Sequence, residues 1–118
     1  MFKILIAEDD AELRQLFSNV LTKNGYTVRG VSNGAEALDE LENGYYDLII
    51  TDVMMPVMDG YSLIKELREA GITLPALMIT AKNAFDDMQR GYASGTDDYM
   101  IKPVNVNEMV LKVGALLR

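Results

Sequence analysis

The sequence contains no cysteine, no histidine and no tryptophan among its 118 residues. Without cysteine the chain cannot form disulfides, thiolate nucleophiles or zinc–thiolate sites, and a cytoplasmic location is expected. Without histidine it lacks Ser-His and Cys-His catalytic pairs, imidazole metal ligands and a phosphohistidine of its own. Any chemistry at this chain is therefore expected to use carboxylates, hydroxyl groups and lysine.

Long apolar runs and positive charge are also scarce. No apolar segment reaches the length of a membrane span, and the first residues enter a strand-like run without a signal peptide. The 11 Lys and Arg residues stand against 18 Asp and Glu residues, which gives a formal net charge of −7. Since nucleic-acid backbones require a basic surface, we expect no direct nucleic-acid binding by this chain. Since no apolar run is long enough to span a bilayer, we expect no membrane association.

The remaining pattern alternates short apolar runs with amphipathic segments. Strands are predicted at residues 3–7, 26–31, 46–52, 74–80 and 98–101. Helices are predicted at about 11–23, 34–42, 60–70, 85–94 and 106–117, the second capped by Ser32 or Asn33. The stripe of the first helix that should face the core consists of Leu13, Leu16, Phe17, Val20 and Leu21. This order predicts one α/β domain over residues 1–118, a doubly wound (βα)5 sandwich of three layers around a parallel sheet.

Polar residues stand at the ends of four of these strands. They are Glu8 and Asp9 just after the first, Asp52 as the last residue of the third, Thr80 as the last residue of the fourth and Lys102 just after the fifth. Each has an ordinary explanation when taken alone, such as a turn or a helix cap. However, the carboxyl ends of parallel strands converge on one crevice, so these side chains should meet.

The types of these residues indicate a divalent cation or a phosphoryl group. Asp9 and Asp52 are oxygen ligands suited to Mg²⁺, and Glu8 can act through a water. Lys102 offsets part of the negative charge and suits a phosphoryl oxygen, while Thr80 offers a hydroxyl donor.

The motifs resemble the receiver domain of two-component response regulators, which accepts a phosphoryl group on an aspartate. The resemblance covers the whole chain and rests on residues 4–10, 47–52, 55–60, 78–81 and 95–103. It implies a flavodoxin-like sheet of order 2-1-3-4-5, with Asp52 as the phosphoacceptor and a sensor histidine kinase as the donor. It also implies Mg²⁺, for which Mn²⁺ can substitute, held by Asp9, Asp52 and the backbone carbonyl of Met54, with Glu8 reached through water.

The same resemblance implies a conformational switch. Thr80 would move toward the phosphoryl group, and Tyr99 would then move inward, so that the fourth helix, fifth strand and fifth helix form the readout face. The peptide bond before Pro103 is expected to be cis. Such a protein is not an enzyme beyond its own phosphorylation and dephosphorylation. Met54 and Lys82 flank the path of an attacking water, and the apolar Met54 predicts slow dephosphorylation.

The last residues, 108–118, resemble receivers that continue into a winged-helix DNA-binding domain, the OmpR/PhoB-like class. Members of this class dimerise on phosphorylation through charge pairs on the readout face. The residues that fit this pattern are Asp97, Asp98, Glu108 and Lys112. Met88 and Ala93 occupy the places of two of the usual charged partners. The output domain would lie outside this chain, which is expected to be cut from a longer regulator.

Other readings remain open at this point. A stand-alone regulator or the receiver of a hybrid kinase would carry the same motifs. A phosphohydrolase that forms an aspartyl phosphate usually has an acid two residues after its nucleophile, where this chain has Met54. A nucleotide- or flavin-binding module would need a glycine- or hydroxyl-rich loop after the first strand, where residues 8–10 are acidic and would repel phosphate.

Overall fold

The computed structural model describes residues 1–81 and 95–118 of the chain. Five parallel strands form the sheet: β1 (Lys3–Ala7), β2 (Thr27–Val31), β3 (Leu48–Asp52), β4 (Ala76–Thr80) and β5 (Asp98–Ile101). Their order is β2-β1-β3-β4-β5, which confirms the predicted doubly wound topology. The strands β3 and β4 each begin two residues later than predicted, because apolar residues in the preceding loops extend the strand-like pattern.

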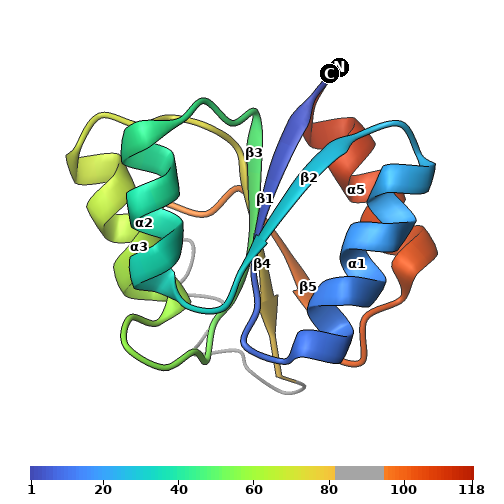
Figure 1. Ribbon diagram of the computed structural model, residues 1–118, viewed down its shortest axis with the longest axis horizontal. Helices are drawn as coiled ribbons and strands as arrows, with labels where there is room; N and C mark the ends of the chain where they lie inside the picture. The colour runs from blue at the N-terminus through green and yellow to red at the C-terminus, as the bar shows by residue number, and fades with distance from the viewer. Residues whose placement is uncertain (82–94) are drawn as a thin grey trace.

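Helices cover both faces of this sheet, as Figure 1 shows. The helices α1 (Ala11–Lys23) and α5 (Val106–Leu116) lie on one face, and α2 (Gly34–Asn43) and α3 (Gly60–Glu69) lie on the other. These bounds agree with the predicted ones to within one residue. The helix predicted at residues 85–94 lies outside the described part of the chain. In the described residues no helix is long and apolar enough to cross a membrane.

The alternation of side chains along the strands divides the core into two clusters. Leu5, Ile49 and Met78 face α2 and α3, whereas Ile4, Ile50 and Leu77 face α1 and α5. The central strands β3 and β4 are buried along their whole length, while β2 is partly exposed at the sheet edge. The continuous apolar runs of the sequence therefore reflect burial on both faces of the sheet.

One predicted core position of α1 is wrong. Phe17 and Leu21 are buried and Leu13 and Val20 pack beside them, but Leu16 is 45% exposed. Successive helical residues are about 100° apart, so the residue before Phe17 is turned out of the buried stripe. Leu16 instead lines an apolar groove of about 450 Å³ with Leu13, Phe17, Lys102, Pro103 and Val104.

Two glycines allow the loop after β3 to pack tightly beside α2 and α3. An added Cβ at Gly60 would lie 2.3 Å from the backbone carbonyl oxygen of Asp52. At Gly34, the first residue of α2, it would lie 2.5 Å from the carbonyl oxygen of Met58, which accepts a hydrogen bond from the Gly34 amide. Both contacts involve backbone atoms, so no side-chain movement could make room. The end of β3 at Asp52 is thus packed against α3, and the loop that follows it is packed against α2.

Candidate functional site

Three carboxylates meet at the carboxyl ends of β1 and β3. Glu8 and Asp9 follow β1, and Asp52 ends the neighbouring β3, with Ala7 in register with Thr51. Each carboxylate can offer an oxygen within 4.8 Å of the others. Glu8 is 2% exposed and Asp52 is 3% exposed, whereas Asp9 is exposed to solvent. Two of the three carboxylates are therefore buried, and solvent reaches the cluster at Asp9.

The environment of Glu8 leaves one oxygen without a partner. Its Oε2 accepts a hydrogen bond from the Asp10 amide at 3.2 Å. Its Oε1 is buried and has no hydrogen-bond partner among the described residues. Burial raises the pKa of Glu8 to about 7; the Asp10 amide opposes this shift, and the carboxylate of Asp52 adds to it.

Lys102 brings a positive charge to Asp52 from two strands away. It follows β5, and its Nζ donates a hydrogen bond to Asp52 Oδ2 at 2.7 Å. Partial burial by itself would lower the pKa of Lys102, but the hydrogen bond and charge of Asp52, together with Glu8 and Asp9, raise it above its usual value. The Lys102–Pro103 peptide bond is cis, as the resemblance implies.

Thr80 lies between these charged groups at the end of β4. Its side chain is 1% exposed, and its Oγ1 has no hydrogen-bond partner in the part of the chain that the structure describes. Tyr99 on β5 is 5% exposed and belongs to the core cluster that faces α2 and α3. In this structure Tyr99 is therefore already inward. The side chain of Met54 is 75% exposed, which leaves an apolar group on the surface two residues after Asp52.

This arrangement fits a hard divalent cation. Like charges held this close in a buried site repel one another, and a cation with oxygen ligands would relieve that repulsion. The buried Oε1 of Glu8, which has no hydrogen-bond partner among the described residues, would also be satisfied by the hydration shell of such a cation. Within residues 1–81 and 95–118, this is the one group of three or more acidic side chains close enough to share an ion.

The four charged residues predicted for a dimer face are placed differently from one another. Lys112 on α5 donates a hydrogen bond to Asp98 on β5 at 3.0 Å, within one chain. Asp97 instead accepts hydrogen bonds from the Ala76 amide at 2.8 Å and from Arg68 at 3.1 Å. Glu108 is exposed in the first turn of α5. The structure therefore brings Asp98 and Lys112 together, and Asp97 is engaged with α3 and β4.

Two arginines that contact residues of the predicted site and dimer face were not predicted from the sequence. Arg68, in the last turn of α3, also donates hydrogen bonds to the carbonyl oxygens of Gly95 at 3.0 Å and Ile72 at 2.9 Å. Arg14, in α1, donates to the carbonyl oxygen of Glu8 at 2.7 Å. The only sequence signal for Arg14 is its position, about one helical turn after the acidic residues 8–10. Such a signal is weak, because basic residues are common on helix surfaces.

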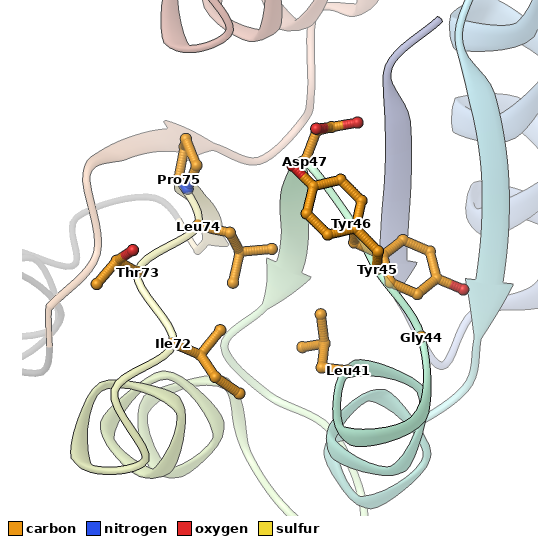
Figure 2. Close-up of a pocket in the computed structure, with 9 residues that line it drawn as sticks. All are labelled: Leu41, Gly44, Tyr45, Tyr46, Asp47, Ile72, Thr73, Leu74 and Pro75. Atoms are coloured by element: carbon orange, nitrogen blue, oxygen red, sulfur yellow. The ribbon is translucent and has the colours of Figure 1, made fainter.

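A separate cavity lies at the opposite end of the sheet (Figure 2). Its volume is about 390 Å³, and it lies between the segments that precede β3 and β4. Leu41, Ile72 and Leu74 line it together with Tyr45 and Asp47, among others. The Asp47 carboxylate already accepts a hydrogen bond from the Lys3 amide at 2.7 Å. This cavity shares no residue with the acidic site.

Comparison with known proteins agrees with the geometry. The family model described as Response regulator receiver domain matches residues 4–114. The chain belongs to the response-regulator receiver family. This receiver is 43% identical over 118 residues to the transcriptional regulatory protein CiaR of Streptococcus pneumoniae, covering 100% of this chain and 52% of the relative. It is 40% identical over 116 residues to the transcriptional regulatory protein ResD of Bacillus subtilis, covering 98% of this chain and 48% of the relative.

Solved structures show the same fold. The receiver domain of the Francisella response regulator 1452 matches with a TM-score of 0.95 and 34% identity, covering 99% of this chain and 97% of that one. The chemotaxis protein CheY4 of Vibrio cholerae matches with a TM-score of 0.93 and 33% identity, covering 99% of both chains. The receiver thus matches these two solved chains over nearly their full length, but it spans about half the length of the curated relatives it matches.

Proposed function

We propose that this receiver accepts a phosphoryl group on Asp52 in a reaction that requires Mg²⁺, with a sensor histidine kinase as the donor. The observation that carries the proposal is the contact of the buried Asp52 carboxylate with Lys102 at 2.7 Å, inside the cluster with Glu8 and Asp9. A buried nucleophile with a cation beside it and acidic metal ligands around it is the arrangement that phosphoryl transfer requires.

Each residue of the site has a separate role in the proposed phosphoryl transfer. Mg²⁺, held by Asp9, Asp52 and the backbone carbonyl of Met54, with Glu8 reached through water, would supply positive charge to the phosphoryl oxygens. One oxygen of Asp52 attacks the phosphorus in line, and the phosphorus–nitrogen bond to the donor imidazole breaks. The Lys102 ammonium then pairs with a phosphoryl oxygen instead of with the carboxylate alone. The imidazole leaves and takes a proton from solvent.

The new acyl phosphate adds negative charge close to Thr80, and this is the origin of the switch that we propose. The partnerless Thr80 hydroxyl can donate a hydrogen bond to a phosphoryl oxygen. Its displacement would change the packing around Tyr99, which is buried on the neighbouring β5. The salt bridge between Asp98 and Lys112 couples β5 to α5, so a shift of the strand reaches the helix.

We also propose how the switch is read. The relatives CiaR and ResD are named transcriptional regulatory proteins, and each is about twice as long as this chain. Their names and lengths support a regulator in which residues 1–118 form one receiver domain and a DNA-binding output domain lies outside this chain. We further propose that phosphorylation leads to a homodimer, formed through Asp97, Asp98, Glu108 and Lys112. We propose that the protein receives its phosphoryl group in the cytoplasm.

Small phosphoryl donors test the chemistry without the kinase. The protein is incubated with Mg²⁺ and either acetyl phosphate or phosphoramidate, whose phosphorus–nitrogen bond resembles that of phosphohistidine. Intact-mass spectrometry should show one added phosphoryl group, and peptide mapping should place it on Asp52. Removal of Mg²⁺ should abolish the reaction, and Mn²⁺ should restore it.

Two variants make this test specific. Asp52→Ala should gain no phosphoryl group, whereas Asp39→Ala, which removes an exposed carboxylate from α2, should react like the wild type. Phosphorylation of Asp52→Ala, or reaction at the wild-type rate without a divalent cation, would contradict the proposal. For the dimer, sedimentation with and without Mg²⁺ and beryllofluoride should show association only with both present, and Lys112→Glu should prevent it.

A further inference from the structure

We propose that Arg14 is a positioning residue for the metal site, which holds the peptide unit between Glu8 and Asp9 in the orientation that cation binding needs. The inference rests on the proposed function, since it concerns the same Mg²⁺ site. Arg14 lies in α1, and its Nη1 reaches back to the carbonyl oxygen of Glu8 at 2.7 Å. A charged donor at this distance makes one of the stronger hydrogen bonds in proteins.

The contact fixes the direction of two consecutive carboxylates. The peptide unit that joins Glu8 to Asp9 is planar, so holding its carbonyl oxygen sets the orientation of the whole plane. The preceding peptide is held as well, because the Glu8 amide donates to the carbonyl oxygen of Val31 at 3.0 Å. Glu8 then points into the protein while Asp9 stays exposed beside it. A shared ion requires their oxygens to meet despite these opposite environments.

Gly30 on the edge strand β2 leaves the space through which Arg14 reaches Glu8. An added Cβ at Gly30 would lie 3.0 Å from both Cγ and Cδ of Arg14. Gly30 is in register with Ile6, whose side chain faces α1 and α5, so the arginine stem lies across the sheet edge on that side. A larger side chain at position 30 would have to displace the stem, because the arginine is the movable partner.

Charge and positioning predict opposite effects on metal affinity. Arg14 is a cation close to a cation site, so its charge by itself weakens Mg²⁺ binding, and its removal should strengthen it. If the hydrogen bond to Glu8 positions the ligands, its removal should instead weaken binding. Loss of a group that orients metal ligands typically costs about tenfold in affinity or more. The sign of the change therefore separates the two roles.

The neighbouring Arg29 provides a matched control. It lines the same polar groove as Arg14, but its Nε pairs with Glu40 at 3.0 Å and its side chain is 61% exposed. Arg29→Met removes the same charge from the same groove and leaves the contact with Glu8 intact. Arg14→Met keeps an unbranched apolar stem over Gly30 and removes the hydrogen bond.

The experiment measures Mg²⁺ affinity by isothermal titration calorimetry, and urea unfolding without Mg²⁺ as a separate readout of folding. Arg14→Met and Gly30→Val should each raise the Kd for Mg²⁺ about tenfold. The double variant should be no weaker than Arg14→Met alone, because both changes remove one contact. Arg29→Met should bind as tightly as the wild type or more tightly. Hydrogen exchange at the amides of residues 9 and 10 should be faster in Arg14→Met than in Arg29→Met.

Three results would overturn the inference. They are unchanged or tighter Mg²⁺ binding in Arg14→Met, equal weakening in Arg29→Met, and wild-type binding in Gly30→Val. Wild-type protein and Asp9→Asn separate this outcome from failure of the proposed function. If the wild type binds no Mg²⁺, the proposed function fails; if it binds and Asp9→Asn does not, only the role of Arg14 is in question.

Discussion

Val57 holds a backbone conformation that valine rarely adopts, in the loop that follows Asp52. Its φ is 70°, which places it in the left-handed region, and its side chain is 82% exposed. In that region the Cβ approaches the following carbonyl oxygen, and β-branching adds to the crowding. Asparagine tolerates this conformation because its short polar side chain can form local hydrogen bonds. We therefore predict that Val57→Asn stabilises the protein.

The size of the effect follows from two contributions. The left-handed conformation costs roughly 1–2 kcal/mol for an ordinary residue. Against this, an exposed valine contributes little burial, on the order of 0.5 kcal/mol at most. The net gain should be about 1 kcal/mol in the free energy of unfolding, or a rise of roughly 4 °C in Tm for a domain of this size.

Urea unfolding of a short series tests the explanation. Val57→Gly also removes the strain, but the more flexible unfolded chain offsets roughly 0.5–1 kcal/mol, so its gain should be smaller. Val57→Ala keeps a Cβ and loses only the branching, so it should gain least. An Asn variant that is no more stable than the wild type, or an Ala variant that gains as much as Asn, would refute the reasoning.

Three further predictions concern the loop after Asp52, the far end of the sheet and the lifetime of the phosphoryl group. Gly60→Ala should cost about 1–3 kcal/mol in urea unfolding and slow phosphorylation by acetyl phosphate, because its Cβ would lie 2.3 Å from the Asp52 carbonyl oxygen; a neutral effect would contradict this. Burial and the hydrogen bond to Glu40 raise the pKa of Tyr46 to about 12, so the folded state keeps a proton that the unfolded state loses above pH 10.0. Stability should fall as the pH rises between these values, and Tyr46→Phe should show a smaller fall; equal pH profiles would show that another group is responsible. The exposed, apolar Met54 cannot orient an attacking water, so the acyl phosphate should persist for many minutes or longer by mass spectrometry, and Met54→Asn should shorten its lifetime; a wild-type half-life of seconds would count against this.

Local patterns in the sequence were enough to find the elements of the fold. The helix α1 has its predicted bounds, because its apolar spacing is a short-range signal. The order of the strands in the sheet could not be predicted from local patterns. Periodicity predicted five parallel strands, but the order came from the resemblance to receivers, and the structure confirms it. Leu16 shows the limit of periodicity, since an apolar stripe wider than the buried face leaves one member outside.

The acidic site was predicted from the positions of its residues at strand ends, a rule that holds for any parallel sheet. Only the tertiary structure decided how each residue is used. Glu8 and Asp9 are adjacent in sequence, yet one is buried with a raised pKa and the other is exposed, because the chain turns between them. Lys102 contacts Asp52 across β4, and Arg14 binds the Glu8 carbonyl. Such contacts depend on how elements distant in the sequence pack together, and no local pattern of residues encodes that packing.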